Sequence, residues 1–239
     1  MIFVNDVLRT FINDILNSIF VRNTINVASK YGYMFVDGVF YTLLLSAIAV
    51  FFGTILGSLL SMLRMARFSA LRGIATAYIE IIRGTPLLLQ LYLFYFLLPD
   101  IFPFLDDKFL CISIALVFNS AAYVSEIVRA GVQAVDRGQT EAARSLGMNG
   151  VQTMIRIILP QAIRNILPAL CNEFIMVIKE TSLASTFFIG DIMSQYKKIQ
   201  GLTYLVIEPL IIAGIIYFIL TFTLSKVVAV FERRMKTGD

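Results

Sequence analysis

Polar side chains that recur at helical spacing within apolar segments are the residues of this sequence best placed for chemistry. Asn119, Tyr123 and Glu126 stand at i, i+4 and i+7, so a helix would carry them on one face. Two other apolar segments repeat the spacing, as Arg83, Leu87 and Gln90 and as Asn172, Met176 and Lys179. Amide, phenol, carboxylate and cationic groups together suit a zwitterion, whose carboxylate needs cationic donors and whose ammonium needs anionic acceptors.

The hypothesis for these stripes is a path for a small polar solute. Its lining residues would be Gln90, Asn119, Tyr123 and Ser182, and Arg83, Glu126 and Lys179 would shape its charge. The alternative is a set of structural ion pairs near the ends of the segments: Glu80 with Arg83, Glu126 with Arg129, and Glu173 or Glu180 with Lys179. Pairing is favoured for the charged residues because several lie near segment ends, and the path is favoured for Asn119 and Tyr123, which lie deeper.

The elements that position these stripes must be membrane helices. Hydrophobic residues make up 58% of the 239 residues, charged residues only 15%, and the mean hydropathy is +0.81. A soluble domain carries about 25% charged residues, and about 20 apolar residues suffice to span a bilayer as a helix. The sequence predicts an all-α integral membrane protein with five spans, at about 39–63, 75–98, 109–128, 166–188 and 205–230.

The cations indicate the direction of these spans. Lys and Arg are more frequent in the segments that follow spans one, three and five than in the other connections. Cytoplasmic loops of membrane proteins carry such an excess of Lys and Arg. We therefore expect the N-terminus outside and the C-terminus in the cytoplasm. Within span one, Gly53 and Gly57 have the GxxxG spacing that lets another helix approach closely.

Residues 1–35 precede the predicted transmembrane domain at 36–232. Val7, Phe11 and Ile15 belong to an apolar stripe with polar residues between them, which is typical of an amphipathic helix in the membrane interface. A helix packed against the other spans is the alternative. The segment lacks the basic start and uninterrupted apolar core of a signal peptide.

Several chemistries are excluded by composition. The chain has no His, which removes Ser-His-Asp catalysis and imidazole metal sites. Cys111 and Cys171 have no metal-ligand spacing and are expected to be small buried hydrophobes. We therefore expect no catalytic residue, no metal site and no cofactor-binding residue in this chain.

The connection between spans three and four, at about 130–165, carries its own structure. Residues 140–146 are predicted to form a helix of about two turns that Gly147 ends. A second helical stretch, about 151–159, is predicted to end at Pro160. Ala142, Ala143 and Leu146 would present a small apolar surface suited to a groove on another protein. The alternative is a plain tether between two spans.

This connection resembles the EAA motif of bacterial ABC importer permeases. The matching residues are Glu141, Ala142, Ala143, Gly147, Ile157, Leu159 and Pro160, within EAARSLGMNGVQTMIRIILPQA. Three further blocks resemble the polar amino-acid (histidine and glutamine) subfamily: residues 83–91 (RGTPLLLQL), residues 119–123 (NSAAY) with Glu126, and residues 179–183 (KETSL). Glu180 stands where the subfamily more often has Asp.

The resemblance implies the type I ABC importer fold and a permease subunit in the bacterial cytoplasmic (inner) membrane. It implies two cytoplasmic ATPase subunits that bind ATP and Mg²⁺, a second permease subunit, an extracytoplasmic solute-binding protein and an amino-acid substrate. The family's coupling helix, which seats in a cleft of the ATPase, maps onto Glu141, Ala142, Ala143, Leu146 and Gly147. Independently, the chain has no GxxxxGK[ST] with which to cradle nucleotide phosphates.

Two other function classes are compatible with polar residues in apolar segments. A secondary transporter or channel would also explain polar stripes, but it typically shows internal repeats, which are not seen here. A membrane-embedded enzyme would need a Ser/Lys or paired-acid arrangement, and none stands out. Acids slightly outnumber bases within and near the spans, which favours a cationic or zwitterionic solute. The sequence identifies neither the amino acid nor whether the second permease is another copy of this chain.

Overall fold

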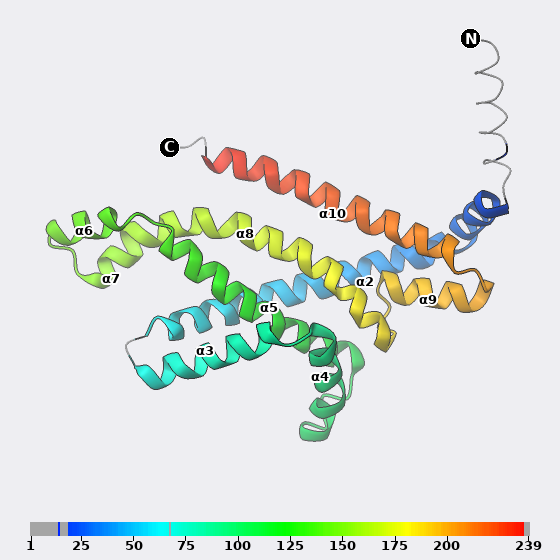
Figure 1. Ribbon diagram of the computed structural model, residues 1–239, viewed down its shortest axis with the longest axis horizontal. Helices are drawn as coiled ribbons and strands as arrows, with labels where there is room; N and C mark the ends of the chain where they lie inside the picture. Colours follow the sequence, from blue (N-terminus) through cyan, green and yellow to red (C-terminus); the bar gives the residue numbers. More distant parts are fainter. Residues whose placement is uncertain (1–13, 15–18, 67, 237–239) are drawn as a thin grey trace, which may run out of the picture.

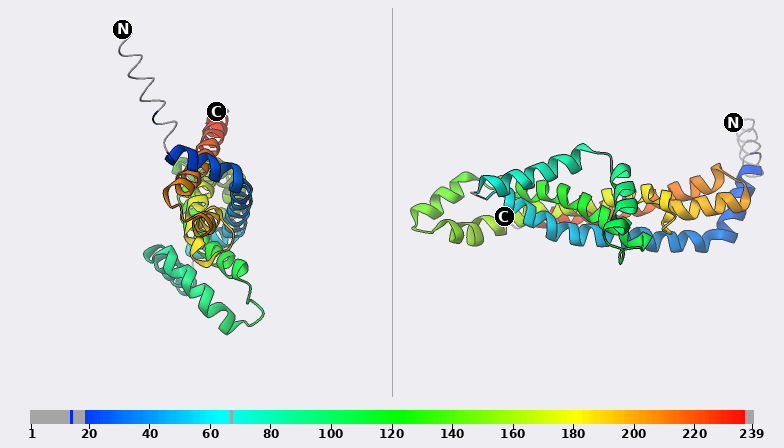
Figure 2. Two further views of the ribbon diagram at one scale, coloured as in Figure 1. Left: turned by 90° about the vertical axis from the view of Figure 1, so that its right-hand side faces the viewer. Right: turned by 90° about the horizontal axis from the view of Figure 1, so that it is seen from below.

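The computed structural model describes residue 14 and residues 19–66 and 68–236, and it shows an elongated bundle of helices (Figures 1 and 2). The described residues form helices and no strand. In chain order these are α2 (Ile19–Arg64), α3 (Ser69–Gly84), α4 (Leu87–Ile101), α5 (Lys108–Gln133), α6 (Arg137–Ser145), α7 (Gly150–Thr153), the π-helix η1 (Met154–Ile158), α8 (Leu159–Glu180), the 3₁₀-helix η2 (Thr181–Phe187), α9 (Ile192–Thr203) and α10 (Ile207–Lys236). Within the described residues, four helical segments are long and apolar enough to cross a membrane, and the number is five if the bent pair α3–α4 counts as one span.

The pair α2 and α5 forms the centre of the bundle, and small residues set its spacing. A Cβ atom on Gly57 would lie 2.6 Å from the Ala121 carbonyl oxygen, and one on Gly53 would lie 2.9 Å from the Ser120 Cβ. Contacts that short exclude any side chain larger than glycine without movement of α5. The close approach predicted from the GxxxG spacing is therefore confirmed, and its partner is α5.

The first helix is longer than the predicted span. α2 has 46 residues and, at 1.5 Å per residue, reaches about 69 Å, well beyond the ~30 Å of a bilayer core. It passes through residue 35 without a break, so residues 19–35 are not a separate segment. Val27 and Phe35 pack against α9 and α10, which stabilises this extension. The remainder of the predicted interfacial segment, including its stripe at Val7, Phe11 and Ile15, lies outside the described residues.

The second predicted span is broken rather than continuous. The chain bends by 109° between α3 and α4. The prediction that Arg83, Leu87 and Gln90 share one helical face is therefore wrong. The cause is Pro86, which has no N–H and forces the preceding residue out of the helical region. Thr85 is accordingly extended, with φ −119° and ψ 147°.

The fourth span begins earlier than predicted, because the helix does not end at Pro160. The chain passes from α7 through the π-helical turn η1 into α8, and Pro160 stands at the start of α8. The Leu159 N–H donates to the Met154 carbonyl, five residues back. This widened turn accommodates a proline that would break a regular helix.

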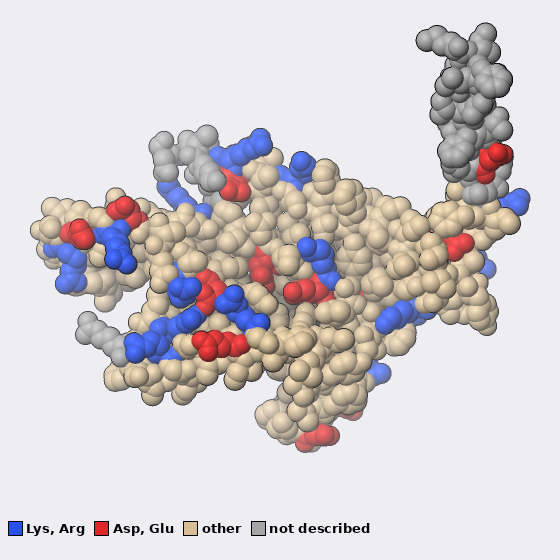
Figure 3. Space-filling model, in the orientation of Figure 1, with Lys and Arg blue, Asp and Glu red and all other residues tan. Residues whose placement is uncertain are grey.

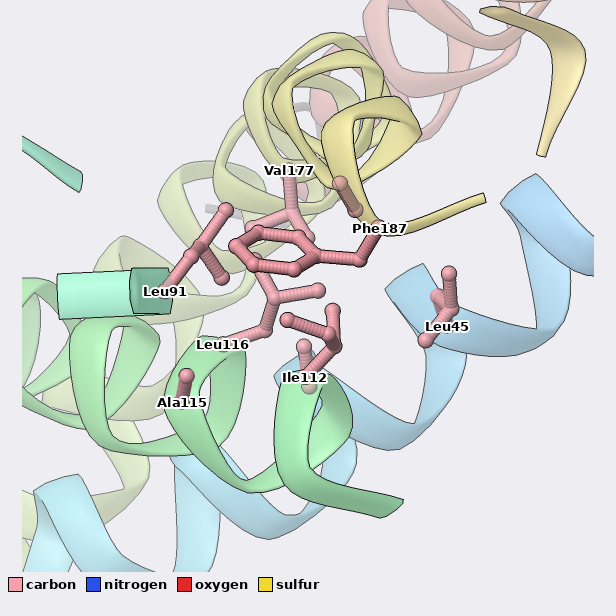
Figure 4. Packing of buried hydrophobic residues seen from close by; sticks show 9 residues of the cluster. Leu45, Leu91, Ile112, Ala115, Leu116, Val177 and Phe187 are labelled. Atoms are coloured by element: carbon pink, nitrogen blue, oxygen red, sulfur yellow. The ribbon is translucent and has the colours of Figure 1, made fainter. Parts of the chain in front are cut away.

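The core holds α4 against the rest of the bundle. Leu91 of α4 packs with Ile112 and Leu116 of α5, and Val177 of α8 and Phe187 of η2 close the cluster (Figure 4). All are at most 6% exposed.

The helix α9 was not predicted from the sequence. Asp191 caps its N-terminus by accepting a hydrogen bond from the Met193 N–H at 3.0 Å.

Candidate functional site

The connection between α5 and α8 folds into a helical hairpin at one end of the molecule (Figure 1). α6 begins where Asp136 Oδ1 accepts from the Gly138 N–H at 2.6 Å, and α7 begins with a reciprocal pair of hydrogen bonds between Asn149 and Gln152. α6 ends at Ser145, and Gly147, two residues further on, has a φ of +85°, in the left-handed region that favours glycine. The predicted helix at 140–146 and its glycine stop are thus confirmed.

The outward face of α6 differs from the predicted one, because Ala143 is buried rather than exposed. Leu146 is 84% exposed, and Glu141 and Ala142 are also exposed, whereas Ala143 is only 4% exposed. Ala143 therefore packs inward against the chain and is not part of an outward apolar surface. The outward surface is formed by Ala142 and Leu146, with Glu141 beside them.

A second feature is a carboxylate surrounded by cations, the Glu126 cluster (Arg64, Arg83, Glu126 and Arg129). Glu126 of α5 forms ion pairs with Arg64 at the end of α2 and with Arg129, whose Nη2 lies 2.6 Å from its Oε2. Arg83, at the end of α3, lies 3.9 Å from it and stacks over the Tyr123 ring at 5.6 Å from the centroid. Figure 3 shows charges of both signs gathered on this face. One carboxylate of α5 thus joins the C-terminal ends of α2 and α3.

These contacts decide between the predicted ion pairs. The pair of Glu126 with Arg129 is confirmed. In the described part of the chain no ion pair joins Glu80 to Arg83, nor Lys179 to Glu173 or Glu180. Glu173 instead accepts from the Ser120 hydroxyl at 3.2 Å, across the α5–α8 packing.

A buried amide network holds the break in the second span. The Gln90 Nε2 donates to the carbonyl oxygens of Ile82 (2.7 Å) and Thr85 (3.2 Å) and to the Thr85 hydroxyl (2.9 Å). Its Oε1 accepts from the Asn119 Nδ2 at 2.9 Å. Gln90 and Asn119 are 4% and 3% exposed. The structure therefore brings these two residues together, as a link between α3, α4 and α5 inside one chain.

Replacing Gln90 with methionine is expected to lower the free energy of unfolding by about 1–3 kcal/mol. Methionine fills the same space but satisfies neither the α3 carbonyls nor the Asn119 amide. Thermal unfolding of the purified chain in detergent measures the loss. An Asn119→Ala change in the same background should add little, because its partner is already gone; full additivity of the two losses would contradict the network.

The third feature is an exposed polar stripe on α8. Asn165, Asn172 and Lys179 recur at every seventh residue and are all exposed, and Met176 between them is 48% exposed. At its α6 end the stripe borders a cavity of about 610 Å³. Polar residues of α8, the α5–α6 junction and α10 line that cavity: Asp136, Gln161, Arg164, Asn165, Asn172 and Glu232. Exposed amides and ammonium groups on a membrane span do not face lipid, so this face borders protein or a wet cavity.

The remaining predicted path residues are separated from the Glu126 cluster. Lys179 and Ser182 belong to α8 and η2, and among the described residues no hydrogen bond or ion pair joins either of them to the cluster or to Gln90. Residues that the sequence did not single out include Asn165 and Arg64. Asn165 continues the seven-residue spacing of Asn172 and Lys179, and that spacing was a signal that could have found it.

Comparison with known proteins agrees with this architecture. Residues 49–237 match the family described as binding-protein-dependent transport system inner membrane component. The arginine transport system permease protein ArtQ of Bacillus subtilis (strain 168) is 42% identical over 203 residues, covering 85% of this chain and 93% of that protein. The putative glutamine transport system permease protein GlnP of Rickettsia bellii (strain RML369-C) is 42% identical over 200 residues, covering 84% and 92%.

Solved structures show the same fold. A crystal structure of an amino acid ABC transporter with histidines contains a chain that superposes with a TM-score of 0.83 at 46% identity, covering 86% of this chain and 96% of that one. An inward-facing MetNI methionine ABC transporter chain shares the fold at 19% identity, with a TM-score of 0.65. The all-helical fold is thus that of type I ABC importer permeases, and the chain belongs to the family of binding-protein-dependent transport system inner membrane components, the multi-pass permease subunits of ABC transporters.

Proposed function

We propose that this permease imports an amino acid, with two ATPase subunits docked on its α6 side, a second permease subunit beside it and a solute-binding protein at the opposite end. The observation that carries the coupling proposal is Leu146, a large apolar side chain that is 84% exposed at the tip of a helical hairpin. Water is a poor solvent for such a group, and a groove on a partner would bury it. Relatives named for arginine and glutamine transport support the solute class.

The proposed mechanism is alternating access between two states of the permease pair. ATP binding would draw the ATPase subunits together and move α6, and the α6–α7 hairpin would transmit that movement to α5 and α8, between which it is inserted. Two states that differ by only a few kcal/mol are required, so that nucleotide binding can invert their populations. ATP and Mg²⁺ would be bound by the partners.

We further propose a refined solute path. Gln90 and Asn119 are engaged within the chain, so they would support the path rather than line it. The α8 stripe of Asn172 and Lys179 would form its wall, completed by the second permease, with Ser182 and Tyr123 as further candidates for its lining. Arg83 and Glu126 would set the charge near it.

Substitution of Asn172 by alanine is expected to lower uptake at least severalfold at normal expression, because an exposed amide in a membrane span is retained for a polar partner. Uptake of radiolabelled amino acid into vesicles measures this, with Met176→Leu as the matched control on the same face. Tyr123→Phe and Asn119→Ala belong to the same series. Unchanged uptake in the Asn172 and Tyr123 variants would remove these residues from the path.

The charge of the solute is a finer question. The excess of acids that favours a cationic or zwitterionic solute is reduced by the structure, because three arginines surround Glu126. Glu173 and Glu180 remain without an ion pair among the described residues and support the same preference. Binding of an amino-acid panel to the partner solute-binding protein tests it, and preference for an acidic amino acid would contradict it.

A further inference from the structure

The cavity of about 610 Å³ at the α6 end of α8 carries charges that the proposed solute path does not use. Its walls come from three places that are distant in the sequence: the α5–α6 junction, one face of α8 and the last turns of α10. Figure 1 shows these three segments at the same end of the molecule. Small-molecule sites have volumes of about 300–1,000 Å³, so the cavity is large enough for a small ligand.

The charged groups that line the cavity are two carboxylates and one cation. Asp136 lies at the α5–α6 junction, Glu232 on α10 and Arg164 on α8. Asp136 and Arg164 are exposed and Glu232 is partly exposed, so a ligand from solvent can reach all three. The remaining polar side chains of the lining are the amides of Gln161, Asn165 and Asn172. The lining therefore has a formal charge of −1 and presents both signs.

This set of groups complements an amino acid that carries a second positive charge. A guanidinium group is the best partner for a carboxylate, and two carboxylates are suited to two cationic donors. A cationic amino acid has one carboxylate and two positive groups, which matches the lining in number and in sign. A phosphate would instead meet two carboxylates. Among the described residues no group of three or more His, Cys, Asp or Glu could hold a metal ion.

Asp136 connects the cavity to α6. Its Oδ1 accepts from the Gly138 N–H at 2.6 Å and so caps the first turn of α6. Val135, the residue before it, packs with Ala162 and Ile166 of α8. α10 packs on α2, α8 and α9, and the cavity lies between α10 and the α5–α6 junction. A ligand that contacts both Asp136 and Glu232 would therefore connect the start of α6 to α10.

We propose that this cavity binds a cationic amino acid from the cytoplasm and that the bound amino acid inhibits transport. The inference rests on the proposed function, which places α6 in the cytoplasm and requires it to move. Arg164 binds the carboxylate, and Asp136 and Glu232 bind the two positive groups. A ligand that connects α6 to α10 stabilises the state in which it binds, and it shifts the equilibrium by the difference between its affinities for the two states. Accumulated amino acid thereby slows its own import.

Titration calorimetry of the purified complex, without the solute-binding protein, measures the binding of L-arginine, L-glutamine and L-glutamate. We expect L-arginine to bind about tenfold more tightly than L-glutamine, which lacks the second positive charge, and L-glutamate to bind more weakly still. Arg164→Gln should weaken L-arginine binding about tenfold. Asp136→Asn should do the same, although asparagine still caps α6. L-Glutamate that binds as tightly as L-arginine would overturn the proposal.

Two variants outside the cavity serve as matched controls for the loss of charge. Arg72→Gln and Glu80→Gln remove an exposed cation and an exposed carboxylate from α3, and both should keep the affinity of the unmodified complex for L-arginine. Because coupling between two sites is reciprocal, a non-hydrolysable ATP analogue on the ATPase subunits should also weaken L-arginine binding. Equal affinities in the Asp136 and Arg164 variants and in these controls would show that L-arginine binds elsewhere.

Proteoliposomes whose ATPase subunits face the medium test the inhibition. With the solute-binding protein and solute inside and ATP in the medium, solute-stimulated ATP hydrolysis tests the proposed function. L-Arginine added to the medium should then lower hydrolysis, and Asp136→Asn should require about tenfold more of it, each variant being compared with its own rate without L-arginine. Stimulated hydrolysis that L-arginine does not lower, or equal inhibition of the variant, would overturn the inhibitory site and leave the proposed function intact. No stimulation by solute at all would contradict the proposed function, and the inhibition with it.

Discussion

Replacement of Gly147 with valine is expected to lower amino-acid uptake about tenfold, with the protein still inserted in the membrane. At φ +85° a β-branched residue is strained by at least 1–2 kcal/mol, so the end of α6 would rearrange. Three backbone hydrogen bonds fix that end: from the N–H of Leu146 to the Ala142 carbonyl (3.1 Å), from the N–H of Gly147 to the Arg144 carbonyl (3.0 Å) and from the N–H of Met148 to the Ala143 carbonyl (3.1 Å). Their loss displaces Leu146, the residue proposed to contact the ATPase. Uptake and solute-stimulated ATP hydrolysis by the purified complex measure the effect.

The matched control for this change is Gly147→Asn. Asparagine tolerates the left-handed conformation, and no atom lies within 4 Å of a Cβ at this position, so the asparagine variant should retain most activity. A difference between the two variants isolates backbone conformation from side-chain bulk. Full uptake and full solute-stimulated ATPase in the valine variant would show that the geometry of this helix end does not transmit the movement.

Replacement of Glu126 with glutamine is expected to destabilise the folded chain by about 1–3 kcal/mol, less than the cost of breaking a fully buried ion pair, because the partners are only partly buried. Its side chain is 17% exposed and that of Arg64 is 24% exposed, so solvent compensates the freed cations only in part. Three guanidinium groups would then repel one another without a carboxylate between them. Thermal unfolding in detergent should show a lower midpoint, and less protein should reach the membrane.

Glu80→Gln serves as the control for this prediction, because Glu80 is an exposed carboxylate on α3 with no ion pair to Arg83. It should change stability by no more than a few tenths of a kcal/mol. The double variant Glu126→Gln, Arg64→Met should recover part of the loss, since it removes a cation along with its partner. Equal stability of the Glu126 and Glu80 variants would mean that the cluster does not join the helix ends.

Features with a local cause could be predicted from the sequence. The apolar runs predicted the spans, Gly147 predicted the end of α6, and the GxxxG spacing predicted a close helix contact. In each case the residue types alone determine the outcome, through burial, a positive φ or the absence of a side chain. The resemblance in the α5–α8 connection predicted the family, which the comparisons confirmed.

Features that depend on packing were predicted wrongly or missed. The RGTP sequence contains Pro86, yet the apolar run around it was interpreted as one straight span. Pro86 breaks the helix, and Gln90 stabilises the break by donating to the carbonyl oxygens of Ile82 and Thr85, eight and five residues before it. Pro160 was predicted to end a helix, but a π-helical turn accommodates it. Ala143 was predicted to be exposed, and the turn of the hairpin directs it inward.

In the candidate site, too, features of a single helix could be predicted from the sequence, whereas contacts between helices could not. The spacing of Asn119, Tyr123 and Glu126 on one helix was predictable, but their neighbours were not. The packing of α2, α3 and α4 against α5 brings Arg64 and Arg83 to Glu126 and brings Gln90 to Asn119, and these contacts join residues 29 or more positions apart. Sequence spacing within one helix contains no information about such contacts.

Photo-crosslinking from position 146 tests the central claim, that α6 is the contact through which a separate ATPase moves the permease. A photoreactive residue in place of Leu146 should form an adduct with a nucleotide-hydrolysing subunit in native membrane vesicles, and the same residue in place of the inward-facing Ala143 should form far less. An adduct yield at position 146 no higher than at Ala143, or no nucleotide-hydrolysing protein among the adducts, would contradict the account.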